Sequence, residues 1–163
     1  MRSIDVAVNI LDKSIERGKK DPNYYMDFAK LHELLYLGQC YFDFKYGMDL
    51  FNEKITANDD GPYVDGLKLI PVICGVDKIE TTDELKLCKM ILPINLLSDE
   101  TVDFILDKFG KYTTDELVRL TKDTMGYQEV YDKSCNNEIN KELIIKTGKS
   151  LFGRKGKQKI HKL

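Results

Sequence analysis

Residues 24–47 read YYMDFAKLHELLYLGQCYFDFKYG, and this stretch decides the fold. Its apolar positions recur at steps of three, four and seven, which is the spacing of one helix face; they are Phe28, Leu31, Leu34, Leu35, Gly38, Tyr41 and Phe42. A second apolar set falls on the other faces: Tyr36, Leu37, Cys40 and Phe44. Because a helix that is apolar almost all round must be covered on most sides, we predict that it is the buried central helix.

The rest of the sequence predicts shorter helices packed around this one. Amphipathic stretches cover residues 3–17, 98–109 and 136–145, and Thr113 to Glu116 form a capping box at the start of another helix. Partial alternation over residues 48–57 predicts one or two short strands, and Asp60-Gly61-Pro62 predicts a helix start, with the helix running over 62–74. The expected fold is therefore mostly α, with a small β element near residues 48–57.

Length and composition predict one globular domain. The chain has 163 residues, of which 42% are hydrophobic. This is enough for one hydrophobic core that needs no disulfide or metal ion to stabilise it. We place this helical domain at residues 1–146 and a basic, flexible tail at 147–163. The apolar runs are too short for a membrane span, and the four cysteines form no C-x-x-C pair. We therefore expect a cytoplasmic protein with free thiols.

The charges are distributed unevenly along the chain. Residues 146–163 hold seven Lys or Arg and no acid, so the first 145 residues hold 25 − 7 = 18 bases against 27 acids, a net charge of −9. An acidic body favours a partner with a basic face. The tail offers an alternative, a regulator that binds nucleic acid; its candidate residues are Lys149, Arg154, Lys155, Lys157 and Lys159.

Residue patterns typical of catalysis are missing from the sequence. The two histidines are His32 and His161, and neither has a serine or cysteine at motif spacing. The Gly-Lys-Ser at residues 148–150 lacks the upstream glycine of a P-loop, since Leu143 stands there. We therefore expect no catalytic residue, metal or cofactor. An enzyme centred on His32 is the remaining alternative, and it predicts loss of activity in His32→Ala.

Aromatic and polar side chains suggest a recognition patch on the central helix and the polar turn after it. Turn residues mounted on a rigid helix are a common place for binding sites. The competing interpretation is that the tyrosines fill the core and keep their hydroxyls at its edge. The candidate partner-binding residues are Tyr36, Gln39, Asn58, Asp59, Asp60 and Tyr63.

Several segments, in order, resemble the Panacea domain of SocA-type antitoxins and phage-associated proteins. They span roughly residues 24–144: KLHELLYLGQ at 30–39, YG at 46–47 followed by LFNE at 50–53, and GPYV at 61–64. LSDE at 97–100 and TDEL at 114–117 continue the series. The resemblance implies a non-enzymatic protein that neutralises a toxin encoded next to it by binding it, in some members by delivering the toxin to a protease.

The sequence departs from that family pattern at five positions. Asn58 and Asp60 stand where Trp and Tyr are usual, and Thr56 replaces an acid. Lys122 replaces a histidine, and Tyr127 stands where a tryptophan is common. Since the altered turn is the predicted recognition surface, we expect a partner different from that of typical members.

Overall fold

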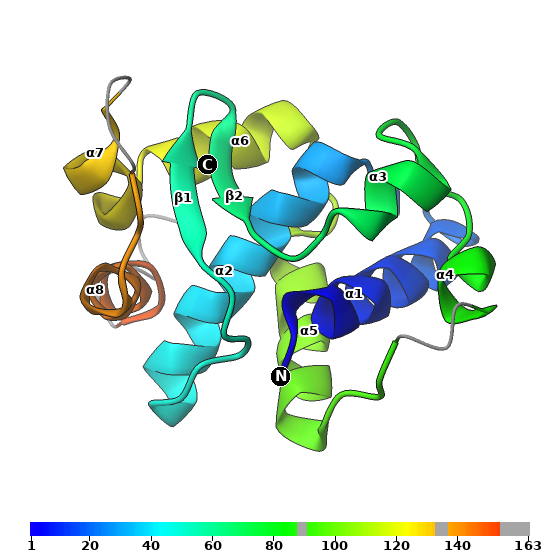
Figure 1. Cartoon of the computed structure of the whole chain (residues 1–163), viewed down its shortest axis with the longest axis horizontal. Helices are drawn as coiled ribbons and strands as arrows, with labels where there is room; N and C mark the ends of the chain where they lie inside the picture. The colour runs from blue at the N-terminus through cyan, green and yellow to red at the C-terminus, as the bar shows by residue number, and fades with distance from the viewer. Residues whose placement is uncertain (88–90, 133–136, 154–163) are drawn as a thin grey trace.

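The computed structural model describes residues 1–87, 91–132 and 137–153 (Figure 1). Its central element is helix α2 (Phe28–Tyr46), which begins after Asp27, whose carboxylate accepts the Lys30 N–H at 2.7 Å. The helix ends at Gly47, which has the left-handed φ of 66° that favours glycine. Every residue from 30 to 43 is buried, so the prediction of a buried central helix covered on most sides is confirmed.

Shorter helices surround α2. Helices α1, α5, α6 and α8 and strand β2 all pack against it. The described helices are α1 (Ser3–Gly18), η1 (Pro22–Tyr24), α3 (Leu69–Cys74), α4 (Asp83–Leu87), α5 (Leu96–Phe109), α6 (Thr114–Lys122), α7 (Met125–Val130) and α8 (Lys141–Phe152). The predicted capping box is present at the start of α6. The mostly helical fold class is therefore confirmed.

The predicted small β element is present as a hairpin, but it lies further along the chain. Strand β1 (Ile55–Asn58) pairs antiparallel with β2 (Gly61–Val64), so only residues 55–57 fall within the predicted range. The helix predicted over 62–74 is wrong in its first half. Asp59 and Asp60 form the two-residue turn, and Gly61, with φ of 122°, returns the chain as a strand instead of starting a helix.

The boundary expected between residues 146 and 147 is also wrong, because it falls inside α8. Asn140 caps this helix by accepting the Leu143 N–H at 3.1 Å, and the helix continues to Phe152. Thr147, Gly148 and Phe152 are buried, so this part of the basic segment belongs to the core. The rest of the predicted tail, residues 154–163, lies outside the described residues, and so does the start of the helix expected over 136–145.

Two further features bear on the sequence-based expectations. Cys40 is buried, Cys74 is half-buried, and both are free thiols, while Cys88 and Cys135 lie outside the described residues. Across the described ranges, no helix combines the length and apolar character needed to cross a membrane.

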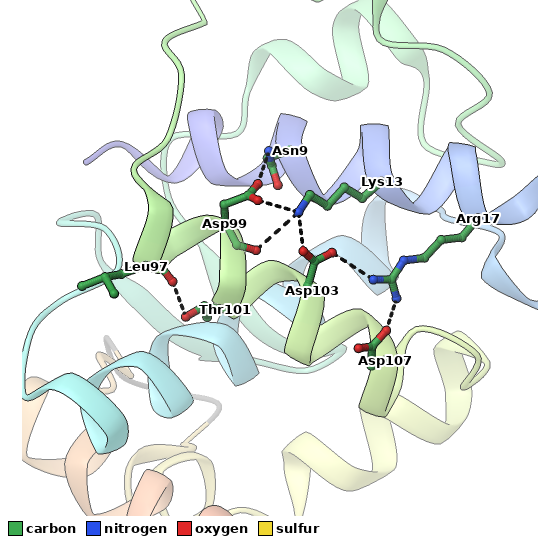
Figure 2. Close-up of polar contacts among 8 residues, drawn as sticks. All are labelled: Asn9, Lys13, Arg17, Leu97, Asp99, Thr101, Asp103 and Asp107. Carbon is green, nitrogen blue, oxygen red and sulfur yellow. Dashed lines mark hydrogen bonds and ion pairs between the residues drawn. The ribbon is translucent and has the colours of Figure 1, made fainter.

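A ladder of ion pairs joins α1 to α5 (Figure 2). Lys13 lies 2.9 Å from Asp99 and 2.7 Å from Asp103. Arg17 lies 3.0 Å from Asp103 and 2.6 Å from Asp107. Partners four residues apart on each helix lie on one face, and the pairs step along both helices in the same direction. Asp103 is the central acid, since it pairs with both bases.

We expect Asp103→Asn to lower the free energy of unfolding by about 1 kcal/mol in low salt, because it removes the acid shared by two partly exposed bases. The measurement is urea denaturation in low salt and in 1 M NaCl, where screening should remove most of the difference. Glu100→Gln, at an exposed acid of the same helix, is the matched control. An equal loss in both salts would show that the ladder does not act through charge.

Candidate functional site

The candidate site is the tip of the β hairpin. Asn58, Asp59 and Asp60 are exposed, and Tyr63 is partly exposed. Ile55 and Ala57 point into the core, so the alternation of β1 turns Asn58 outward and carries the two aspartates beyond the sheet. The tip therefore presents two adjacent carboxylates to solvent.

The hairpin lies beside α6 and α7 (Figure 1), and side chains from α6, α7 and the residue after α7 contact its tip. The Tyr127 hydroxyl donates to the Asn58 carbonyl at 2.6 Å, and the Lys122 ammonium donates to the Asp59 carbonyl at 2.7 Å. The Tyr131 hydroxyl donates to the Asp59 carboxylate. These three contacts, which we call the tip clamp, fix the backbone of the turn as well as one of its carboxylates.

The clamp residues also support one another. The rings of Tyr127 and Tyr131 stack with centroids 5.0 Å apart, and the Lys122 ammonium lies 5.9 Å and 6.0 Å from the two centroids. Burial raises the pKa of Tyr127 to about 12, and the hydrogen bond to Asp59 raises the pKa of Tyr131. Both hydroxyls therefore keep their protons at neutral pH and remain donors to the turn.

A third segment pairs with the outer edge of β1. The Ala57 N–H donates to the Asn137 carbonyl at 2.8 Å, and the Asn137 side-chain amide donates to the Ala57 carbonyl at 3.0 Å. The Ile139 N–H donates to the Ile55 carbonyl at 2.8 Å, and Glu138 pairs with Lys54 at 2.9 Å. The hairpin is thus held along its outer edge as well as at its tip.

Glu33 of α2 lies directly beneath the tip. It is buried, accepts a hydrogen bond from the Thr121 hydroxyl, and has a pKa raised to about 8 because burial disfavours its charged form. A Cβ built at Gly61 would overlap its carboxylate. The turn therefore needs glycine at position 61 for two reasons, the positive φ and the close approach of Glu33.

His32, the candidate base of the enzyme alternative, is part of this support. Its Nδ1 accepts the Val64 N–H at 2.9 Å, and its ring stacks on Tyr63 with centroids 4.4 Å apart. Burial lowers its pKa to about 4, so the ring is neutral at pH 7. Its Nε2 is buried without a hydrogen-bond partner among the described residues. These contacts favour a structural role, because they fix β2 on α2.

The structure brings together four of the six predicted partner-binding residues and separates the other two. Asn58, Asp59, Asp60 and Tyr63 share the hairpin. Tyr36 is buried, with its hydroxyl 2.8 Å from that of Thr124. Gln39 is buried too, and its side-chain oxygen accepts the Leu50 and Phe51 N–H groups at 3.1 Å and 3.2 Å. Both were wrongly placed on an exposed surface, since every residue from 30 to 43 of α2 is buried.

The residues of the alternative nucleic-acid site lie almost entirely outside the described residues. Lys149 is exposed on α8, whereas Arg154, Lys155, Lys157 and Lys159 belong to the undescribed part. Within the described residues, no group of three or more His, Cys, Asp or Glu is arranged to hold a metal ion.

Sequence patterns did not identify the tip clamp as part of the site. Lys122, Tyr127 and Tyr131 lie about 60 to 70 positions from the turn, and no motif connects them to it. One signal could have found two of them. Lys122 and Tyr127 depart from the pattern that the sequence was said to resemble, as Asn58 and Asp60 do, and all four lie at the hairpin tip or contact it.

Comparisons with known proteins do not add a family assignment. The chain matches no protein-family model, no curated protein and no solved structure. The class that the fold and site define is a mostly helical protein that displays a clamped acidic hairpin.

Proposed function

We propose that this chain is an antitoxin-like protein that neutralises a partner toxin by binding it directly. The observation that carries the proposal is the exposed acidic turn at Asn58 to Asp60, fixed from within by the tip clamp. A surface that is ordered before binding loses little conformational entropy in the complex. The turn therefore suits occlusion of a partner's active region better than turnover of a substrate.

Charge indicates the kind of partner. Asp59 and Asp60 are exposed at the tip, and the first 145 residues carry a net charge of −9. Complementary charges speed association and exclude partners of like charge. The proposed partner is therefore a toxin with a basic face around its active region, encoded next to this chain and met in the cytoplasm.

The resemblance to Panacea-domain antitoxins supports the same class. The departures from that pattern at Asn58, Asp60, Lys122 and Tyr127 gather at the tip. A changed turn and a changed clamp in contact with each other fit a partner-specific surface. The toxin would then differ from those of typical members, and the proposal includes delivery of the bound toxin to a protease.

The test is co-expression with the neighbouring open reading frame. We expect the neighbour alone to arrest growth, the native chain to relieve the arrest, and Asp60→Lys to fail to relieve it. With the purified neighbour, Asp60→Lys should weaken binding by at least about tenfold. Asp77→Lys, the same charge change at another exposed position, should bind within about twofold of the native chain.

Two results would contradict the proposal. One is a neighbour that does not affect growth, and the other is equal binding by Asp60→Lys and Asp77→Lys, each with an unchanged melting temperature. Salt-dependent binding of DNA or RNA that disappears when residues 154–163 are removed would instead support the regulator.

A further inference from the structure

A second surface lies far along α2 from the hairpin tip, where the C-terminal half of α2 meets α5 and α8. It is a cavity of about 310 Å³ with a mainly apolar lining. Its lining residues are Tyr41, Phe44, Lys45, Phe104, Lys108, Leu151 and Phe152. We call it the aromatic groove. This volume is at the small end for a ligand site and suits one or two side chains of a larger partner.

The floor of the groove is a fixed aromatic stack. The rings of Tyr41 and Phe104 stack with centroids 3.8 Å apart and an interplanar angle of 10°. Phe152 meets Tyr41 edge to face, with centroids 5.2 Å apart. Phe44, at the mouth, is 39% exposed. The groove thus offers ring edges and one exposed ring for an apolar side chain to contact.

Two lysines make the rim positive. The Lys45 ammonium lies 5.5 Å from the Tyr41 centroid, and the Lys108 ammonium lies 5.8 Å from the Phe104 centroid. The acids nearest to them in sequence have other partners: Asp43 lies 3.9 Å from Lys141, and Asp107 lies 2.6 Å from Arg17. The described lining contains both lysines and no acid.

We propose that the aromatic groove binds a segment of a partner protein in which an apolar side chain is flanked by carboxylates. The apolar residue would enter between Phe44, Leu151 and Phe152, and the carboxylates would pair with Lys45 and Lys108. Charge complementarity selects this occupant. The site is independent of the hairpin tip, whose acidic turn calls for a basic partner surface.

Two other occupants fit less well. Single-stranded nucleic acid is held by bases that stack on open ring faces. In the Tyr41–Phe104 pair the two rings stack on each other, and a lysine ammonium lies over each ring, 5.5 Å and 5.8 Å from the centroids. The chain's own residues 154–163 carry five Lys or Arg and no acid, so they would bring like charges to the rim.

The experiment is NMR titration of the full chain with a synthetic peptide that carries adjacent Leu and Phe between short runs of Asp and Glu. We expect chemical-shift changes at Phe44, Lys45, Lys108 and Leu151. The double variant Lys45→Gln/Lys108→Gln should weaken binding about tenfold, and 1 M NaCl should weaken binding to the native chain. The matched control is Lys20→Gln/Lys68→Gln, which changes two exposed lysines elsewhere and should bind as the native chain does.

Three results would overturn the proposal. The first is an equal response to a peptide with the same acidic runs around Gly and Ser, because the apolar anchor would then have no role. The second is a stronger response to oligothymidylate than to the peptide. The third is a groove signal that changes with protein concentration alone, which would show that a second copy of this chain occupies the groove.

Discussion

Gly148→Ala is expected to lower the free energy of unfolding by about 3 kcal/mol, although alanine is the better helix former by about 1 kcal/mol. Helix α8 crosses α2 at this position. A Cβ on residue 148 would overlap the backbone carbonyl of Cys40 and approach the Phe44 Cβ to 3.0 Å. Since the overlapping atom belongs to the backbone of a buried helix, α8 itself has to move away.

Urea denaturation of the native chain and the variant gives the measurement. Ser150→Ala is the matched control, because residue 150 is exposed on the same helix, and it should stay within about 0.5 kcal/mol of the native chain. If Gly148→Ala were as stable as the native chain, or more stable, helix propensity would outweigh the close crossing, and the packing of α8 on α2 would be looser than described.

Glu33→Gln is expected to remove a pH dependence of stability. The pKa of Glu33 is raised to about 8 in the folded chain, mainly by burial, with Lys122 opposing the shift. Between its unfolded pKa near 4.3 and pH 8, the unfolded state has released this proton and the folded state retains it. The contribution of Glu33 to the free energy of unfolding should therefore fall by roughly 3 kcal/mol from pH 5 to pH 8.

The neighbouring residue gives the opposite slope at lower pH. The pKa of His32 is lowered to about 4 by burial, so the unfolded state binds a proton below pH 6.5 that the folded state does not. Its contribution makes stability fall as the pH drops from 6.5 to 4. From these two residues together we expect the most stable range between about pH 5 and pH 6.

Chemical denaturation at half-unit steps from pH 4 to pH 8 tests this. Glu33→Gln keeps an acceptor for the Thr121 hydroxyl but carries no charge, so its stability should rise from pH 5 to about pH 6.5, as the lowered pKa of His32 requires, and should not fall between pH 6.5 and pH 8. Glu129→Gln, at an exposed acid on α7, should retain the native slope. If Glu33→Gln and the native chain ran parallel over the whole range, Glu33 would not hold a proton in the folded state at pH 7.

Sequence patterns predicted the helices well wherever the signal came from residues close to one another in the sequence. The all-round apolar character of α2 and the capping box at Thr113 depend on neighbours in sequence, and both are present. Asp60-Gly61-Pro62 misled because it is also compatible with a turn, and pairing with β1 decides between the two. The second half of α8 was predicted to be part of a flexible tail, because lysines and glycine interrupt its apolar face.

The candidate site could be predicted only in part. The exposed turn was correctly located, since polar residues with glycine and proline are typical of turns. Tyr36 and Gln39 were misplaced because amphipathicity cannot tell which face of an almost uniformly apolar helix is open. The tip clamp depends on contacts between segments far apart in sequence, which periodicity does not report. In the sequence, Gly148 stood out only as part of an incomplete P-loop motif. In the structure it is the position where α8 and α2 approach each other closely.

The bonding of the hairpin edges limits the way in which another protein can engage it. Three outward groups of β1, which are the N–H of Ala57 and the carbonyls of Ala57 and Ile55, are bound by residues 137–139. On β2, Pro62 has no N–H, and the N–H of Val64 is bound to His32. Addition of a foreign strand to the sheet is thereby blocked. A binding partner must therefore contact the side chains of the hairpin tip. Its selectivity should depend on which residues stand at positions 58–60 and not on main-chain hydrogen bonds.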